Sequence, residues 1–251
     1  MPRFAVIFPA AGRSRRFGGD GPFRLKKPFV DLKGRAVWLR SVEAFLNRDD
    51  VCQTILVLAE EDIADFKERF KANLVFMTTE IVAGGNERVD SVANALARVS
   101  AEADFVAVHD AARPLIAKQW IDAVFAAAAR TGAAIPGVPI SSTVKRVESE
   151  VIRETVPRDQ LWAAQTPQVF EKKLLSDAFA RRTNPPATDE AQLVERLGRQ
   201  VTVVPGSPLN IKITTQDDFR MAAALLDLVP REKMLNKIDA PPPDDSLFGR
   251  I

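Results

Sequence analysis

The fold is decided by one stretch near the N-terminus, Phe4-Ala5-Val6-Ile7-Phe8-Pro9-Ala10-Ala11-Gly12-Arg13-Ser14-Arg15-Arg16-Phe17. Its first half is a run of strand-forming residues, which stops at two alanines and a glycine. Small residues allow a ligand to come close to the backbone, and the amides and arginines that follow are groups that bind phosphate. The stretch therefore predicts a first β-strand whose C-terminal end opens a phosphate-binding loop.

Positive charge is concentrated beside this loop. Residues 13–35 contain eight Arg or Lys and two Asp, so this segment carries +6, while the whole chain carries only +2. An excess of two charges over 251 residues does not form the basic stripe that nucleic-acid binding requires. The pattern favours an enzyme that handles small phosphate compounds, without a nucleic-acid partner.

The remaining composition is that of an ordinary globular protein. Hydrophobic residues make up 46% of the chain and charged residues 27%, which provides ample material for a core. The single cysteine excludes a disulfide within the chain. No apolar run reaches the length of a membrane span, and the N-terminus has the pattern of a strand rather than a signal peptide. We expect a cytoplasmic protein with no membrane partner.

Short apolar segments alternate with helical patterns along the chain. Strands are predicted at 4–8, 54–59, 74–77 and 105–108, and helices at 37–46, 63–70, 87–99 and 119–130. Near-continuous apolar strands are typical of a mostly parallel sheet covered on both sides. We therefore predict a Rossmann-like α/β fold, a twisted sheet with helices on both faces. Ligands of such sheets bind beyond the C-terminal ends of the strands, where residues 10–17 and 109–114 would lie.

Two segments interrupt this alternation. Residues 142–157 are polar, with scattered valines, and we interpret them as an extended hairpin with a turn near residues 148–150. Because such an arm (about 140–158) buries little against its own domain, we expect it to pack on a partner subunit. From residue 231 onward the periodicity is lost, and Pro241-Pro242-Pro243 indicates a flexible tail. The predicted organisation is a catalytic domain at 1–230 and a tail at 231–251.

The glycine-containing loop also invites comparison with dinucleotide-binding proteins. Their signature requires three glycines in the pattern GxGxxG and an acidic residue about 20 positions later. Here the sequence is Gly12-Arg13-Ser14-Arg15-Arg16-Phe17-Gly18, and the second strand ends near Glu60, which is too late. A nucleotide-dependent oxidoreductase is therefore disfavoured.

Further motifs follow in order along the chain. They are Ala10-Ala11-Gly12-x-x-Arg15-Arg16 with Lys27, Gly84-Gly85-Asn86-Glu87-Arg88-Val89-Asp90-Ser91, His109-Asp110-Ala111-Ala112-Arg113-Pro114, Thr143-Val144-Lys145, Thr188-Asp189-Glu190-Ala191 and Asn210-Ile211-Lys212-Ile213-Thr214. The first resembles the nucleotide-binding signature of the sugar-phosphate nucleotidyltransferases. The ordered set resembles the 2-C-methyl-D-erythritol 4-phosphate cytidylyltransferase family of the non-mevalonate isoprenoid pathway, from about residue 4 to residue 226.

This resemblance implies that a phosphate monoester attacks the α-phosphorus of CTP, which forms a CDP-linked alcohol and releases pyrophosphate. The second pKa of such a phosphate is near 6, so the nucleophile is largely ionised at pH 7 and needs no general base. Catalysis would then depend on positioning and on cations around the reacting phosphorus. Mg²⁺ is the implied cofactor, held mainly by CTP phosphates, with Asp110 as a candidate protein ligand.

The resemblance also implies roles for particular residues on the nucleotide side. Arg16 and Lys27 match the family's catalytic basic pair, with Lys26 as an alternative to its neighbour. The residues implied in CTP binding are Ala10, Ala11, Gly12, Gly84, Gly85, Asn86, Ser91 and Asp110. His109, which precedes the last of these, is expected to have a structural, hydrogen-bonded role.

The acceptor side draws on the second half of the chain. The residues implied in substrate binding are Arg113, Thr143, Arg158, Thr166, Thr188 and Lys212. Thr143 and Arg158 lie on the arm, so the resemblance implies a homodimer in which they complete the partner's site. Thr188 has a second interpretation as the N-cap of a helix at 189–197. Thr166 has one as a residue that only shapes the turn beside Pro167.

Two alternatives remain on the functional side. The acceptor could be another polyol phosphate, above all ribitol 5-phosphate, because acceptor choice depends on a few side chains around one small polyol. A nucleotide-binding protein without catalytic activity is the other alternative. The combination of Arg16, Lys27, Asp110 and Lys212 argues against it, since such a protein has no need of all four.

Overall fold

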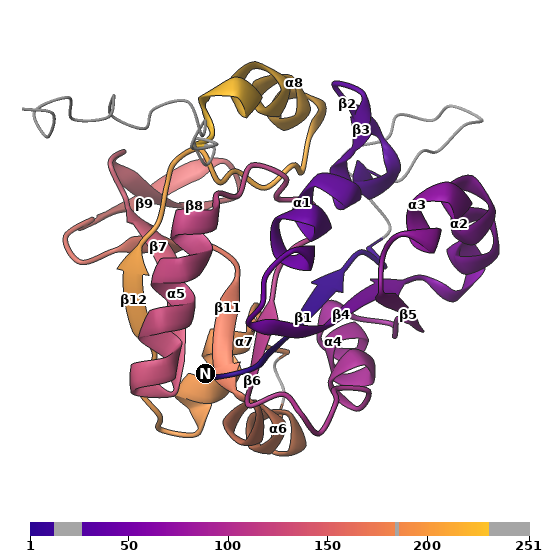
Figure 1. Cartoon of the computed structure of the whole chain (residues 1–251). Coiled ribbons are helices and arrows are strands. Elements are labelled where there is room, and N and C mark those ends of the chain that lie inside the picture. Colours follow the sequence, from indigo (N-terminus) through magenta and orange to yellow (C-terminus); the bar gives the residue numbers. More distant parts are fainter. Residues whose placement is uncertain (13–26, 184–185, 231–251) are drawn as a thin grey trace, which may run out of the picture.

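The computed structural model describes residues 1–12, 27–183 and 186–230. A mixed eight-stranded sheet forms its centre, with the strand order β10-β7-β11-β6-β1-β4-β5 and with β12 paired to β7 (Figure 1). The strands are β1 (Phe4–Pro9), β4 (Val51–Leu58), β5 (Thr79–Ala83), β6 (Phe105–Val108), β7 (Ala133–Pro139), β10 (Trp162–Ala164), β11 (Gln168–Glu171) and β12 (Thr202–Pro205).

The first strand lies in the middle of the sheet. It pairs in parallel with β4 on one side and with β6 on the other, and β5 continues in parallel beyond β4. Residues 4–8 are all buried, which explains why the sequence there is continuously apolar rather than alternating. Within this sheet, the antiparallel pairs are those that β10 and β11 form.

Helices cover both faces of the sheet, as Figure 1 shows. On one face, α1 (Val37–Leu46), α2 (Ile63–Arg69) and α5 (Lys118–Thr131) contribute to a core that contains Trp38, Phe45 and Phe125. On the other, α4 (Arg88–Leu96), α6 (Lys172–Ala180) and α7 (Glu190–Arg196) pack around Val92, Leu175 and other apolar side chains. The prediction of an α/β fold with a mostly parallel, doubly covered sheet is therefore confirmed.

A third, smaller apolar cluster packs the segment around Leu32 against the C-terminal part of the described chain. It holds Leu32, Leu115, Ile213 and Ala222. The remaining elements are β2 (Asp31–Leu32), β3 (Arg35–Ala36), α3 (Lys71–Val75), α8 (Gln216–Leu225) and the short 3₁₀ turns η1 (Lys27–Phe29), η2 (Glu60–Asp62) and η3 (Leu226–Leu228). The predicted tail at 231–251 lies outside the described residues.

The predicted hairpin is present as a separate two-stranded sheet. Strands β8 (Val144–Glu148) and β9 (Val151–Val156) pair antiparallel, and Ser149 and Glu150 both have positive φ at the turn. Nearly every residue of the two strands is exposed. The hairpin therefore contributes little to the core of its own chain, and its packing on a partner remains a prediction.

One predicted strand is wrong. Residues 74–77 do not form a strand, because α3 extends to Val75 and the next strand begins at Thr79. The apolar run is only partly directed inward: Leu74 packs against the core, whereas Phe76 is 89% exposed. The true strand, β5, places Ile81 and Val82 opposite Leu56 and Val57, and this pairing with a fully buried neighbour fixes its register.

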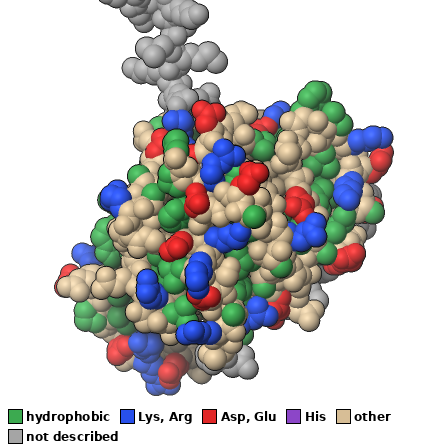
Figure 2. Space-filling model, turned by 60° about the horizontal axis from the view of Figure 1, so that its bottom comes forward, with side chains coloured by type: hydrophobic (Ala, Val, Ile, Leu, Met, Phe, Trp, Pro, Cys, Tyr) green, Lys and Arg blue, Asp and Glu red, His purple; other side chains and the backbone are tan. Residues whose placement is uncertain are grey.

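One face of the molecule has mixed charge. On the face shown in Figure 2, Lys and Arg side chains lie interspersed with Asp and Glu rather than forming a stripe of one sign. None of the helices in the described part of the chain combines the length and apolar character needed to cross a bilayer.

Candidate functional site

The C-terminal ends of the central strands bring distant segments together. The amide of Ala10 donates to the carbonyl of Val57 at 2.8 Å, and the amide of Gly84 donates to that of Leu58 at 2.7 Å. The amide of His109 donates to the carbonyl of Ile7 at 2.9 Å. The segments after β1, β5 and β6 therefore meet at one edge of the sheet, as predicted for a ligand site in this class of fold.

Ala11, Gly84 and Ser91 are in close contact at this edge. A Cβ added to Gly84 would lie 2.6 Å from the Cβ of Ala11 and 2.8 Å from the Oγ of Ser91, so only glycine fits. The hydroxyl of Ser91 accepts a hydrogen bond from the amide of Gly85 at 3.1 Å and is almost completely buried. The predicted CTP-binding residues of two segments are thus adjacent, and the backbone beyond them, at Gly85 and Asn86, is exposed.

The turn that carries these glycines is fixed by the start of α4. Glu87 is the N-cap, and it forms a capping box with Asp90, whose carboxylate accepts from the amide of Glu87 at 3.3 Å. Such reciprocal bonds satisfy amides that the helix itself leaves unpaired. The exposed turn therefore has a defined geometry.

Asp110 is the centre of a buried charge cluster. It is 4% exposed and has three cationic neighbours: Lys212 Nζ at 2.8 Å and Arg113 Nε at 3.5 Å from Oδ2, and Arg88 Nη2 at 3.5 Å from Oδ1. Burial alone would raise the pKa of Asp110, but the surrounding cations, led by Lys212, hold it well below its usual range. The carboxylate is therefore ionised at neutral pH.

Two charged residues of this cluster had no assigned role in the sequence analysis. Arg88 donates to both oxygens of Glu190, at 2.6 and 3.0 Å, and Glu190 is 1% exposed. Burial raises the pKa of Glu190, while Arg88 opposes this effect. Both residues lie inside the quoted motifs, but 102 positions separate them, and nothing local in the sequence indicates that they pair.

His109 is completely buried in a directional chain of hydrogen bonds. Its Nε2 lies 3.2 Å from the carbonyl of Arg113, so this nitrogen must carry the proton. Nδ1 then accepts from the hydroxyl of Thr166 at 3.2 Å, and the same hydroxyl accepts from the amide of Asp110 at 3.1 Å. Burial lowers the pKa of His109 to about 4. The predicted structural role of His109 matches this geometry, and Thr166 holds the Asp110 segment in place.

Asn210 connects three segments around this chain. Its backbone carbonyl accepts from Arg113 Nη1 at 2.7 Å and from the side-chain amide of Gln165 at 3.4 Å, and its own side-chain amide donates to the carbonyl of Thr166 at 2.9 Å. Arg113 is thus largely engaged by protein acceptors, and its side chain is 11% exposed. Lys212, two residues after Asn210, is more accessible at 38%.

The other predicted acceptor residues come from the hairpin and from the segment before α7. Thr143 and Arg158 are exposed at the base of the hairpin, where Arg158 donates to the carbonyl of Ser141. Thr188 lies beside the start of α7, but its interpretation as the N-cap is wrong. Asp189 is the N-cap instead, because its carboxylate accepts from the amide of Gln192 at 3.0 Å.

The predicted catalytic pair cannot be placed. Arg16 lies outside the described residues, as does Lys26, and only the backbone of Lys27 is described, at the start of η1. Gly12 is the last described residue before that gap. The catalytic roles of Arg16 and Lys27 therefore stay a prediction.

The described residues do not offer a metal site. No group of three or more His, Cys, Asp or Glu side chains in these parts of the chain could hold a metal ion. Asp110 does not fit as a ligand in this arrangement, because cations already engage both its oxygens. A divalent ion at this site would depend on oxygens from another source, such as phosphate.

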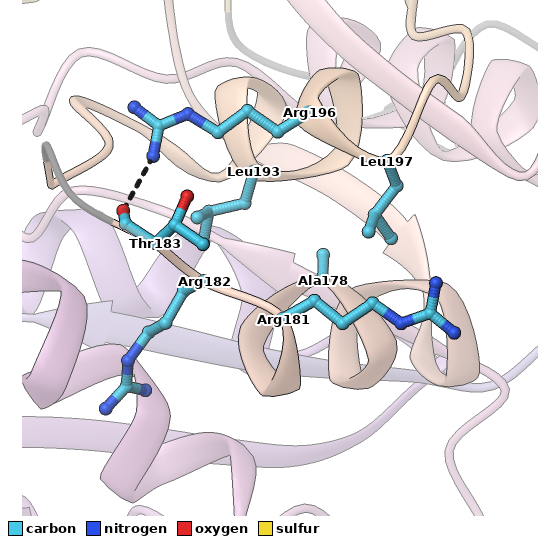
Figure 3. A pocket seen from close by; sticks show the side chains of 7 residues that line it. All are labelled: Ala178, Arg181, Arg182, Thr183, Leu193, Arg196 and Leu197. Carbon is cyan, nitrogen blue, oxygen red and sulfur yellow. Dashed lines mark hydrogen bonds between the residues drawn. The ribbon is translucent and has the colours of Figure 1, made fainter.

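A hollow of about 600 Å³ lies elsewhere, between α6 and α7. Figure 3 shows that its three arginines do not converge: Arg196 donates to the carbonyl of Thr183, and Arg181 and Arg182 extend in different directions. Arg182 instead lies 3.5 Å from Asp90. None of the predicted site residues lines this hollow, so the sheet edge remains the candidate site.

The amino-acid sequence is similar to those of known proteins along most of its length. The family model of 2-C-methyl-D-erythritol 4-phosphate cytidylyltransferase matches residues 4–228. The protein of that name from Rhodopirellula baltica is 42% identical over 234 residues, covering 89% of this chain and 94% of that protein. The one from Endomicrobium trichonymphae is 42% identical over 223 residues, covering 88% and 98%.

Solved structures agree with the sequence comparison. The crystal structure of 2-C-methyl-D-erythritol 4-phosphate cytidylyltransferase from Thermus thermophilus has a TM-score of 0.71 and 32% identity, covering 90% of this chain and 100% of that one. A 4-diphosphocytidyl-2C-methyl-D-erythritol synthase from Anaerococcus prevotii has a TM-score of 0.76 and 27% identity, covering 90% and 96%. The chain belongs to the 2-C-methyl-D-erythritol 4-phosphate cytidylyltransferase family.

Proposed function

We propose that this protein transfers CMP from CTP to 2-C-methyl-D-erythritol 4-phosphate, in the biosynthesis of isoprenoid precursors. A phosphate oxygen of the acceptor forms a bond to the α-phosphorus of CTP, and the bond from that phosphorus to the bridging oxygen breaks. The products are CDP-methylerythritol and pyrophosphate. The observation that carries this proposal is the family match, which extends from residue 4 to residue 228.

The nucleotide half of the site comprises the segments at residues 10–12 and 84–91. Backbone amides and carbonyls there can read the hydrogen-bonding edge of cytosine, and the crowding of Gly84 against Ala11 and Ser91 supports this assignment. Asp110 would bind a ribose hydroxyl. Arg16 and Lys27 would stabilise charge on the reacting phosphates.

The acceptor half comprises Lys212 with Arg113, Thr166, Thr188 and the arm residues Thr143 and Arg158. Lys212 is the best placed to bind the acceptor's phosphate, since it is the most accessible of the three cations around Asp110. Mg²⁺ would bind through CTP phosphate oxygens, because the described carboxylates do not form a site for it.

Dimerisation through the arm is part of the proposal. The hairpin exposes Val147, Val151 and Ile152, each at more than 50%, and Trp162 nearby is 45% exposed. Apolar side chains at such exposure are typical of a surface that packs against another chain. Thr143 and Arg158 would then contribute to the partner's site.

Turnover of defined substrates tests the reaction. The protein is incubated with Mg²⁺, CTP and either methylerythritol phosphate or ribitol 5-phosphate, and pyrophosphate release is measured. We expect release with the first acceptor and much less with the second. Equal rates, or none with methylerythritol phosphate, would contradict the proposed acceptor.

Mixed protomers test the shared site. Arg158→Ala and Lys27→Ala proteins, each inactive alone, should regain activity when mixed, because one of the two sites in a heterodimer would be intact. Lys26→Ala serves as the control for the choice of lysine, and a greater loss in that variant would move the catalytic role to Lys26. An absence of recovery would contradict the shared site.

A further inference from the structure

A buried ion pair joins two parts of the site that are far apart in the sequence. Glu190 is 1% exposed, and both its oxygens accept from the guanidinium of Arg88, at 2.6 and 3.0 Å. Such bidentate pairs fix the direction as well as the distance between two side chains. The pair therefore defines how the starts of α4 and α7 lie relative to each other.

On one side, the pair lies next to the nucleotide half. Arg88 is the first residue of α4 and closely follows the turn that carries Gly85 and Asn86. Its Nη2 atom also lies 3.5 Å from Oδ1 of Asp110. Arg88 is thus shared between two carboxylates, and its position depends on both.

On the other side, the pair lies next to Thr188 in the acceptor half. Glu190 is the first residue of α7, two positions after Thr188. The same helix start is held by Gln168, which donates to Asp189 at 2.8 Å and accepts from the amide of Ala191 at 3.0 Å. The backbone around Thr188 is therefore anchored from two directions, by β11 and by Arg88.

A buried ion pair of this kind is poorly explained by stability alone. Removing two charges from water costs about as much as their attraction returns, and apolar side chains of similar size are often as stabilising. A geometric requirement is a better explanation. In-line displacement at phosphorus needs the two substrates aligned, and a misplacement of about 1 Å can cost roughly a hundredfold in rate.

We propose that Glu190 is a positioning residue that fixes the nucleotide half of the site to the acceptor half through Arg88. The inference rests on the proposed function, which defines these halves. Without the carboxylate of Glu190, Arg88 would move towards Asp110 and compete there with Lys212. Each half would still bind its own substrate, but their alignment would be lost.

Glu190→Gln tests this, because it removes the charge and keeps the size of the side chain. We expect kcat to fall by about 10- to 100-fold, while the Kd for CTP, measured by calorimetry without acceptor, stays within about threefold of wild type. Glu195→Gln on the exposed side of the same helix is the matched control, and its kcat should equal that of wild type. An unchanged kcat in Glu190→Gln, or a CTP Kd weakened as much as kcat, would overturn the proposal.

Glu190→Asp covers the case in which the first variant fails to fold. It keeps the charge but shortens the side chain by one methylene, so it cannot reach both nitrogens of Arg88 from the same backbone position. A positioning role predicts a slow enzyme of near-normal Tm. A purely electrostatic role predicts full recovery of kcat, and a purely structural role predicts a lowered Tm, so either result would overturn the proposal. Wild type that does not turn over CTP and methylerythritol phosphate would contradict the proposed function itself, independently of either variant.

Discussion

The charge cluster around Asp110 and the β8–β9 hairpin hold similar kinds of side chains in opposite surroundings. In the cluster, Asp110 and Glu190 are almost completely buried, and their partners come from segments up to 102 residues away. In the hairpin, the ion pairs Arg146–Glu154 and Arg153–Glu148 join neighbouring strands, with every side chain more than half exposed. The cluster is defined by its own chain, whereas the hairpin leaves its outer faces without a partner among the described residues.

This difference shows in which surroundings an ion pair affects the free energy of unfolding most. A buried ion retains strong interactions because the surrounding dielectric is low, and a missing partner leaves an uncompensated charge. An exposed pair is screened by water and salt, so it contributes little. Four measurements put this contrast to the test.

The largest effect is expected for Asp110→Asn. The change keeps the shape of the side chain but leaves Lys212 and Arg113 without the carboxylate that they contact, while Arg88 retains only Glu190. We expect the free energy of unfolding in urea to fall by about 3 kcal/mol, together with loss of pyrophosphate release. Asp177→Asn, on the exposed surface of α6, is the control and should unfold like wild type. A loss no greater than in this control would contradict the importance assigned to burial.

Steric crowding at Gly84 is expected to give the next largest loss of stability. In Gly84→Ala the new methyl group would lie within 3 Å of both Ala11 and Ser91, so the backbone must shift. Overpacking of this kind costs about 1–3 kcal/mol, and the CTP affinity should fall with it. Gly12→Ala is the control for stability, because an added Cβ there meets no described atom within 4 Å. Equal stability of the two variants in urea would contradict this packing.

Protonation of His109 gives a graded effect that is small near neutral pH and grows only as the pH falls. Its pKa is about 4 in the folded state and about 6.5 when unfolded, so between these values the unfolded chain binds one more proton. The free energy of unfolding should therefore decrease as pH falls, by about 1.4 kcal/mol per unit between pH 6.5 and pH 4.5. Because the chain has a single histidine, His109→Gln should flatten the profile between about pH 6.5 and 5, above the range of most carboxylates. If the free energy of unfolding of this variant still falls with pH in that range, the slope comes from the protonation of other groups.

The smallest effect is expected on the hairpin. Glu154→Gln removes the exposed ion pair with Arg146, and the free energy of unfolding should change by less than about 1 kcal/mol. At high salt the difference between this variant and wild type should become smaller still, because salt screens an exposed pair. A larger loss that depends on protein concentration would instead indicate that this pair lies at a subunit contact.

The sequence predicted those parts of the fold that rest on local patterns. The buried run at 4–8 and the amphipathic helices at 37–46 and 87–99 could be read directly, because their periodicity reflects which face is covered. The strand predicted from the apolar run at 74–77 was wrong, because these hydrophobic residues are not all buried: Phe76 is exposed. Helix starts were harder to predict for a similar reason, since Thr188 and Asp189 are both good caps and only the folded contacts select Asp189.

The candidate site was predictable residue by residue only through the resemblance to a family. Composition and spacing indicated a phosphate site after β1, but they could not show that Arg88 pairs with Glu190. Long-range pairing depends on the sheet topology, which brings together residues that no local pattern connects. The same holds for Asn210, whose backbone carbonyl accepts from Arg113 and Gln165 and whose side-chain amide donates to Thr166, all of them at least 44 positions away.

The position of Asn210 has a consequence for the order of events in folding. Its contacts with Arg113, Gln165 and Thr166 close loops of 44 to 97 residues. Trp38 of α1 instead packs against Phe66 and Phe70, about 30 residues farther along the chain, and shorter loops cost less entropy to close. A nascent chain that ends before β12 could complete β1, β4 and β6 yet would lack Lys212, which lies beside Asp110 in the finished protein. During refolding, enzymatic activity should therefore return after the tryptophan of α1 is buried, which makes turnover a late reporter of the native state.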